Sequence, residues 1–345
     1  MKEIKTIEFK KDILYLIDQR KLPTSYEMFE CKDYKDVDFA IKDMVVRGAP
    51  AIGATAAYGV VLAAKEFLNE DKDIFLKKLD EALEILNNSR PTAVNLMWAI
   101  KRMRDLIEEN KNLDVEKIYE KIRKEADDIY NEDIDTNKKM AKYGNEVIKK
   151  GATILTHCNT GALATVAYGT ALGVIREAHY TGKNIFVYAD ETRPRLQGGK
   201  LTAWELVQEE IPAKLIADNV AATLIRDGKI DVILVGADRI ANNGDTANKI
   251  GTFMLSVIAK VYNVPFYIVA PTTTIDFDIE SGKQIEIEER SSEEVTHING
   301  VRVAPEGIDV YNPAFDVTPC ENINGIITEK GIIKPPFKEN ILKLK

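Results

Sequence analysis

The chain has 345 residues, of which 47 are Lys or Arg and 55 are Asp or Glu, so the formal net charge is −8. The apolar share of 45% is typical of a folded globular protein and too high for a disordered one. The negative charge argues against sequence-independent binding to nucleic acid, which needs a basic surface. We therefore expect a globular protein of one or two domains that does not bind nucleic acid.

The cysteines and the apolar runs restrict the cellular compartment. Cys31, Cys158 and Cys320 are too few and too far apart for a disulfide framework or a metal knuckle. The first residues lack the basic, apolar and small-residue order of a signal peptide. No apolar run approaches the roughly 18 residues of a membrane span. These features predict a cytoplasmic protein that makes no membrane contact.

The first part of the chain is mainly helical in pattern. Short apolar runs at 4–9 and 13–17 predict strands, and a helical pattern over 41–65 is interrupted at 47–50. Further helices are predicted around the leucines at 76–86, from Pro91 onward, and over 114–150. The helix from Pro91 is expected to bury a face made of Val94, Met97, Trp98 and Leu106.

The pattern changes after residue 151. Continuous apolar runs alternate with helix-compatible stretches, which predicts a parallel sheet covered by helices on both faces. The runs lie at 152–156, 185–189, 213–217, 231–235 and 265–269, and the helical stretches at 161–180, 200–210, 219–228 and 248–262. We predict an α/β protein with a smaller, mainly helical N-terminal domain (1–125) and a Rossmann-like, parallel-sheet C-terminal domain (126–345).

Reactive side chains follow two of the predicted strands, where ligands bind in open α/β sheets. Cys158 precedes a predicted helix whose dipole would favour a thiolate, so it suits a nucleophile, acid or base; it could instead be a small buried residue. His157 should point to the opposite face, so no Cys–His dyad is expected. Asp238 follows another strand, where partial burial would raise its pKa toward acid–base use; it could instead cap a loop or pair with Arg239.

Anion-binding features are also present. Arg47 and Gly48 open a predicted helix, where backbone N–H groups and the guanidinium could hold a phosphate, and Thr160–Gly161 looks similar. Other phosphate candidates, each of which could equally be a solvated or ion-paired group, are Arg90, Arg193, Arg195 and Lys249. There is no G-x-G-x-x-G or P-loop motif, and the three histidines lack metal spacing, so no cofactor or metal is predicted.

Seven motifs occur in one order: VRGAPAIG (46–53), SRPTAVNL (89–96), THCNTG (156–161), ETRPRLQG (191–198), GADRI (236–240), NKIGT (248–252) and NPAFDVTP (312–319). In these the chain resembles the S-methyl-5-thioribose-1-phosphate isomerase family, the aldose–ketose isomerases of methionine salvage. The resemblance runs from about residue 40 to 336. One departure is Ser291–Ser292, where a proline often follows the arginine.

The resemblance implies a helical N-terminal domain, a Rossmann-like C-terminal domain, a homodimer, and catalysis without a metal or organic cofactor. It also implies that Cys158 and Asp238 form the catalytic pair, with Asp238 as the proton donor. The substrate, a small sugar phosphate, would be contacted by Arg47, Gly48, Ala49, Arg90, Gln197, Asn248 and Lys249.

Other functions fit parts of the same pattern. A ribose 1,5-bisphosphate isomerase would share Cys158 and Asp238 but need a second phosphate site, and 5-deoxyribose 1-phosphate is another possible substrate. Regulatory subunits of the eukaryotic translation-initiation exchange factor share the fold. Those subunits are expected to lack the full Cys158/Asp238 pair, so the pair favours an enzyme.

Overall fold

The computed structural model describes residues 4–90 and 94–345. The chain divides into two compact units. The N-terminal unit consists of residues 4–135 together with the returning segment Ala162–Gly169, and the Rossmann unit of Thr136–Gly161 and Thr170–Lys345. The change of unit falls inside helix α5 (Val115–Asn145), which also contains the boundary expected after residue 125.

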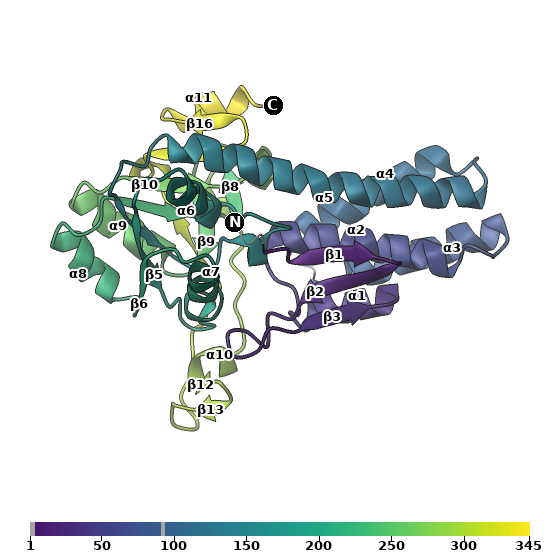
Figure 1. Ribbon diagram of the computed structural model, residues 1–345, viewed down its shortest axis with the longest axis horizontal. Coiled ribbons are helices and arrows are strands. Elements are labelled where there is room, and N and C mark those ends of the chain that lie inside the picture. Colours follow the sequence, from purple (N-terminus) through teal and green to yellow (C-terminus); the bar gives the residue numbers. More distant parts are fainter. Residues whose placement is uncertain (1–3, 91–93) are drawn as a thin grey trace. The chain divides into compact units, whose positions relative to one another are not determined.

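The N-terminal unit joins a small antiparallel sheet to a group of helices (Figure 1). The two expected strands form, and a third, not predicted, pairs with the second. The helix expected from Pro91 is present, although Pro91 itself lies outside the described residues. Before α5, the elements are β1 (Ile7–Lys10), β2 (Ile13–Ile17), β3 (Met28–Cys31), α1 (Tyr34–Lys42), α2 (Ala49–Glu66), α3 (Lys72–Asn87) and α4 (Val94–Asn110).

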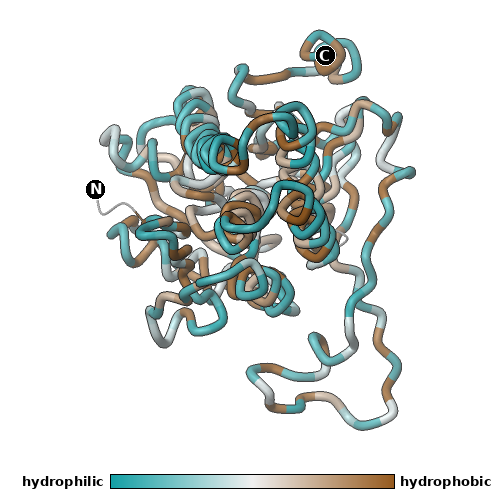
Figure 2. The backbone as a smooth tube through the Cα atoms, turned by 90° about the vertical axis from the view of Figure 1, so that its right-hand side faces the viewer, coloured by the Kyte–Doolittle hydropathy of each residue, from teal (hydrophilic) through white to brown (hydrophobic). Residues whose placement is uncertain are grey.

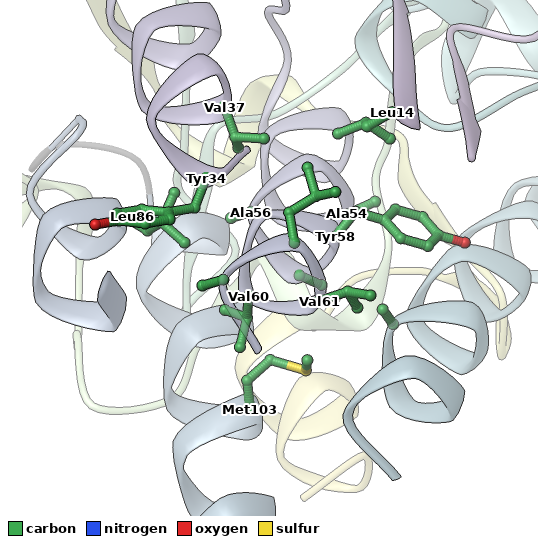
Figure 3. Packing of buried hydrophobic residues seen from close by; sticks show 14 of the residues in the cluster. Leu14, Tyr34, Val37, Ala54, Ala56, Tyr58, Val60, Val61, Leu86 and Met103 are labelled. Carbon is green, nitrogen blue, oxygen red and sulfur yellow. The ribbon is translucent and has the colours of Figure 1, made fainter. Parts of the chain in front are cut away.

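Helix α2 is the centre of this unit. Every residue over 51–64 is buried, as expected for a helix that is apolar on all sides. Figure 3 shows Val60 and Val61 of α2 among side chains that include Val37 of α1 and Met103 of α4. The surrounding helices therefore fix the position of α2 and of the Arg47–Gly48 turn at its start.

The predicted buried face of α4 is wrong in part. Met97 and Trp98 are 40% and 39% exposed, and Trp98 lies against the guanidinium of Arg102, 5.4 Å from the ring centroid. Successive residues of a helix point in directions only about 100° apart. Apolar spacing alone therefore does not show which of two adjacent lines of side chains on α4 faces the core. The row that is buried consists of Leu96, Ala99, Ile100 and Met103.

The Rossmann unit is built on a seven-stranded sheet. Its order is β16-β15-β10-β7-β4-β5-β6, with only β16 antiparallel to its neighbour. The five predicted runs form β4 (Thr153–Thr156), β5 (Phe186–Asp190), β6 (Ala213–Ile216), β7 (Val232–Val235) and β10 (Phe266–Val269), and the edge adds β15 (Gly325–Thr328) and β16 (Gly331–Ile333). Numbered along the chain, the parallel strands have the order 3-2-1-4-5-6 of dinucleotide-binding folds, which reverses between β4 and β7.

Both faces of the sheet are covered. In β7, Ile233 and Val235 belong to one apolar cluster, while Val232 and Leu234 belong to another, because alternate residues face opposite sides. Figure 2 shows hydrophobic and hydrophilic residues alternating along the helices, as expected for helices with one apolar side. The predicted Rossmann-like architecture is thus confirmed.

The covering helices are α6 (Ala171–Tyr180), α7 (Ala203–Gln208), α8 (Val220–Arg226), α9 (Thr252–Val261) and α11 (Phe337–Leu342), with the π-helical turn η2 (Gly198–Thr202) before α7. A second sheet, not predicted, consists of β8 (Arg239–Ala241), β9 (Thr246–Lys249), β11 (Ile275–Asp276) and β14 (Phe315–Thr318). The turn-rich tail adds α10 (Glu293–Thr296) and a hairpin of β12 (His297–Ile298) and β13 (Val301–Arg302), which extends from the main sheet in Figure 1. Among the described residues, no helix combines the length and apolarity that a membrane crossing needs.

Candidate active site

The two predicted catalytic residues follow the two strands that flank the reversal of strand order. Cys158 comes two residues after β4 and Asp238 three residues after β7, and these strands are adjacent and parallel. Loops that follow adjacent parallel strands lie at the same edge of the sheet, and the reversal point is where such folds bind ligands. The structure therefore places both residues at the expected edge.

Cys158 is held by its backbone in an unusual conformation. Its φ is +65°, a left-handed value that is uncommon for a residue with a side chain. Its N–H donates to Thr192 Oγ1 at 2.8 Å, and its carbonyl accepts from Thr202 Oγ1 at 2.6 Å. The residue is half-buried, so its thiol is neither part of the core nor fully solvated.

His157 is a structural neighbour of Cys158, as the sequence predicted. The side chain is buried, with Nδ1 2.9 Å from Asp190 Oδ2 and Nε2 2.9 Å from the carbonyl oxygen of Ile250. Both ring nitrogens thus face acceptors, which favours the doubly protonated imidazolium. The ring connects the end of β5 to the turn before α9 and does not serve Cys158 as a base.

The pKa values of this buried pair are coupled. Burial lowers the pKa of His157, but its hydrogen bond to Asp190, the charge of that carboxylate and the Ile250 carbonyl outweigh burial and raise it above 6.5. Burial raises the pKa of Asp190 to about 6, against the opposing effect of His157. The contacts of both ring nitrogens therefore favour the imidazolium–carboxylate form of the pair.

Asp238 lies in a more open environment than the sequence suggested. The residue is exposed, whereas partial burial was expected. Its N–H donates to the carbonyl of Ala247 on β9 at 2.9 Å, which fixes the backbone. The neighbouring Arg239 extends to Asp276 on β11, with 3.7 Å between the charged groups. Asp238 thus lies exposed in the short turn between β7 and β8.

Three predicted substrate contacts lie in the same unit and are buried. Gln197 precedes η2, and its Oε1 has no hydrogen-bond partner among the described residues. Asn248 on β9 donates from Nδ2 to Thr252 Oγ1 at 3.0 Å. Lys249 donates from Nζ to the Ala314 carbonyl at 3.0 Å and lies 4.2 Å from the centroid of the Phe315 ring. Two amide side chains and one ammonium group are therefore held on ordered strands and turns.

The remaining predicted contacts belong to the N-terminal unit. Gly48 is the residue before α2, with φ +93°, and a Cβ at this position would lie 2.6 Å from the carbonyl carbon of Ala164. Arg47, half-buried, donates from Nη2 to the Gln19 carbonyl at 3.4 Å, and Ala49 begins the helix. Arg90 is half-buried at the end of the segment after α3.

Two other anion-binding predictions are not supported. Arg193 donates to the carbonyls of Pro194 and Val295, and Arg195 forms an ion pair with Glu294 at 2.7 Å, so both guanidinium groups are used within the protein. The α-helix expected from Gly161 begins only at Ala171. The intervening residues instead form the short 3-10 turn η1 (Ala162–Ala164) of the N-terminal unit.

Two groups of acidic and metal-binding side chains occur among the described residues, and both are engaged within the protein. In the first, His157 and Asp190 bind each other, while Asp218 accepts the N–H groups of residues 192 and 193. The second is formed by Asp245, Cys320 and Glu321, and Asp245 accepts the N–H of Cys320. We assign neither group to a metal.

The residues that hold Cys158 in place were not predicted from the sequence. Thr192 is 34 positions away along the chain, and Thr202 also comes from a later segment. A signal was available, since polar residues directly after a buried parallel strand lie at the ligand-binding edge. A polar residue at such a position can be placed at the ligand-binding edge of the sheet. Its position does not show which backbone group its hydroxyl will bind.

The fold and site define a class: a Rossmann-like α/β protein with a thiol and a carboxyl at the reversal point of its sheet, joined to a helical N-terminal unit. The model of the initiation factor 2 subunit (IF-2B) family matches residues 45–335, and the chain belongs to this family. The matched region includes all seven motifs.

Two relatives of full length carry the same name. Proteins of Thermoanaerobacter sp. (strain X514) and Caldanaerobacter subterraneus subsp. tengcongensis are 83% and 79% identical to the chain, over 100% of each chain, and are named methylthioribose-1-phosphate isomerase. These names confirm the resemblance predicted from the motifs.

Two solved structures are similar over nearly the whole chain. The 5-methylthioribose 1-phosphate isomerase of Pyrococcus horikoshii OT3 has a TM-score of 0.96 and 48% identity, covering 100% of this chain and 96% of that one. The translation initiation factor eIF-2B subunit delta from A. fulgidus has a TM-score of 0.91 and 43% identity, covering 99% of both. The fold is thus shared by proteins named for two different functions.

Proposed function

We propose that this chain is an isomerase that converts S-methyl-5-thio-α-D-ribose 1-phosphate to S-methyl-5-thio-D-ribulose 1-phosphate in methionine salvage. The observation that carries the proposal is that Cys158 and Asp238 directly follow two adjacent parallel strands, β4 and β7, at the reversal point of the sheet. The isomerase names of the full-length relatives support the same reaction.

The substrate explains why an acid is needed. An ordinary aldose opens its ring by losing the proton of the C1 hydroxyl, but here that oxygen carries phosphate. The ring oxygen must therefore take a proton as its bond to C1 breaks. We assign this proton to Asp238, whose backbone is fixed by the bond to Ala247.

Hydrogen must then move from C2 to C1. In one route Cys158 removes the C2 proton, an enediol-type intermediate forms, and the proton returns at C1. In the other route hydride passes directly from C2 to C1 in an oxocarbenium-like species. In both routes the C2 hydroxyl loses its proton as the ketone forms, which replaces the proton that Asp238 gave to the ring oxygen, so the reaction balances overall. Both routes are favoured by a pocket from which water is excluded during the reaction.

Substrate binding is assigned to the polar groups around this pair. The Gln197 Oε1, buried without a partner among the described residues, is suited to accept a sugar hydroxyl. Asn248 and Lys249 supply further donors on β9. From the N-terminal unit, the resemblance assigns contacts with the phosphate and hydroxyls to Arg47, Gly48, Ala49 and Arg90.

We also propose that the protein is a cytoplasmic homodimer, as the resemblance implies. The outer face of α9 supports a second copy as its partner, because Phe253, Val257 and Val261 recur every four residues and are 41%, 38% and 66% exposed.

A substrate panel tests the proposed reaction. Turnover is measured with 5-methylthioribose 1-phosphate, 5-deoxyribose 1-phosphate and ribose 1,5-bisphosphate under one set of conditions. We expect the highest kcat/KM for the methylthio sugar. A preference for the bisphosphate would assign the chain to the sister reaction, and no turnover of any of the three would favour a non-catalytic subunit.

A further inference from the structure

Thr192 has a conformation that its residue type disfavours. It is fully buried, and its φ is +62°. A β-branched residue rarely adopts positive φ, and such a strained residue persists only where its surroundings hold it. We therefore ask which contacts hold Thr192 in this conformation and what its side chain does there.

A carboxylate from the next strand holds it. Asp218, which follows β6, accepts the N–H of Thr192 at 2.6 Å through Oδ1 and the N–H of Arg193 at 2.7 Å through Oδ2. Two charge-assisted bonds to consecutive N–H groups fix the turn after β5. Gly198 lies against the same turn, since a Cβ there would be 2.9 Å from Thr192 Oγ1.

The strained turn places the Thr192 hydroxyl under Cys158. Its Oγ1 accepts the Cys158 N–H at 2.8 Å and donates to the Asp190 carbonyl at 3.2 Å. Hydrogen bonds thus join the loops after β6, β5 and β4, three neighbouring strands of the sheet. The bond from the Cys158 N–H to Thr192 Oγ1 fixes a second residue with a left-handed backbone, since Cys158 has φ +65°. A strained turn after a parallel strand is also how α/β-hydrolases present their nucleophile.

We propose that Thr192 is a positioning residue for the reaction. Its hydroxyl holds the Cys158 peptide in the left-handed turn that presents the thiol at the sheet edge. The inference rests on the proposed function, because it gives Thr192 a role only through Cys158. Thr192 touches no reacting atom in this assignment, so its effect should fall on kcat and leave KM unchanged.

The test is the Thr192→Val variant with Thr192→Ser as its rescue. Valine keeps the branched shape but removes the acceptor of the Cys158 N–H, whereas serine restores the hydroxyl. We expect kcat with 5-methylthioribose 1-phosphate to fall about 10- to 100-fold in the valine variant, the range for a slightly misplaced reacting group, and to recover in the serine variant. If the valine protein does not fold, Thr192→Ala removes the same hydroxyl with less steric strain.

A matched control separates positioning from stability. Thr328 on β15 is also buried, and its hydroxyl donates to the Gly331 carbonyl at 3.0 Å and accepts the Lys330 N–H at 3.1 Å. Thr328→Val should lower the Tm comparably and leave kcat unchanged; an equal loss of kcat would overturn the inference. It is also overturned if Thr192→Val keeps full kcat while Cys158→Ser is inactive. Full activity of Cys158→Ser would instead overturn the proposed role of the thiol.

Discussion

The substitution Gly48→Ala examines how tightly the turn before α2 is built. Gly48 has φ +93°, and an added Cβ would lie 2.6 Å from the carbonyl carbon of Ala164. The segment around Ala164 cannot move easily, because Gln19 Nε2 donates to the Leu163 carbonyl at 2.7 Å and Val166 N–H donates to Asp133 Oδ2 at 2.8 Å. The new side chain therefore meets fixed backbone.

Two contributions determine the size of the effect. A left-handed backbone costs a residue with a side chain about 1–2 kcal/mol. Overpacking against a fixed neighbour costs about 1–3 kcal/mol more. We therefore expect the free energy of unfolding of the N-terminal unit to fall by about 2–5 kcal/mol. If the turn shifts instead of unfolding the unit, the KM for the substrate should rise, since Gly48 is a proposed contact.

A second glycine isolates the packing contribution. Gly151 has φ +78°, and an added Cβ would have no other atom within 4 Å, so Gly151→Ala should cost only the backbone contribution. The two tryptophans report on the two units separately, because Trp98 lies in α4 and Trp204 in α7. The stability of Gly48→Ala is measured by urea unfolding followed by Trp98 fluorescence in a Trp204→Phe background. The stability of Gly151→Ala is measured in the same way by Trp204 fluorescence in a Trp98→Phe background. Equal losses in the two variants would refute the packing argument.

Three further predictions concern the reaction, the buried ion pair and the assembly. Cys158→Ser and Asp238→Asn should fold normally and lose most turnover, and a near-wild-type kcat in either variant would remove that residue from the mechanism. The raised pKa of His157 means that holding its proton stabilises the fold, a contribution that is fully present below about pH 6.5 and is lost as the pH rises through the folded pKa; because the pKa of Asp190 is about 6, the comparison is made above that pH. The Tm difference between wild type and His157→Gln should therefore narrow above that pH, and a constant difference would contradict the assignment. Val257→Glu on α9 should convert the proposed dimer to a monomer, as measured by the molar mass in light scattering. An unchanged mass would exclude this face of α9 as the dimer interface.

The main sheet can be predicted from the sequence because its strands are buried on both sides. Such strands are continuous apolar runs, and FVYAD at β5 and VILV at β7 are recognisable for that reason. The strand β9 is not recognisable, since its sequence TANK is polar although all four residues are buried. Its neighbours in the second sheet are β8 and the much later strand β14. Local pattern carries no information about such long-range burial.

For the site, the sequence could place side chains at strand ends but could not show which strands are neighbours. That Cys158 and Asp238 share one edge depends on the pairing of β4 with β7, whose residues are almost 80 positions apart along the chain. The exposure of Asp238 and the bond from Cys158 to Thr192 also depend on tertiary structure. The motif resemblance located these residues without explaining how they are held.

The net charge of −8 leaves the question of how an acidic protein would bind an anionic sugar phosphate. Helix N-termini attract anions, but at α9 this position is already used, because Asp316 accepts the N–H groups of Gly251 at 2.7 Å and Phe253 at 3.0 Å. At α2, by contrast, the residue before the helix is Gly48, and no described side chain caps the first turn. The 18-residue α2 therefore begins without an internal carboxylate and with the cationic Arg47 beside it, which makes its first turn the better candidate for the phosphate.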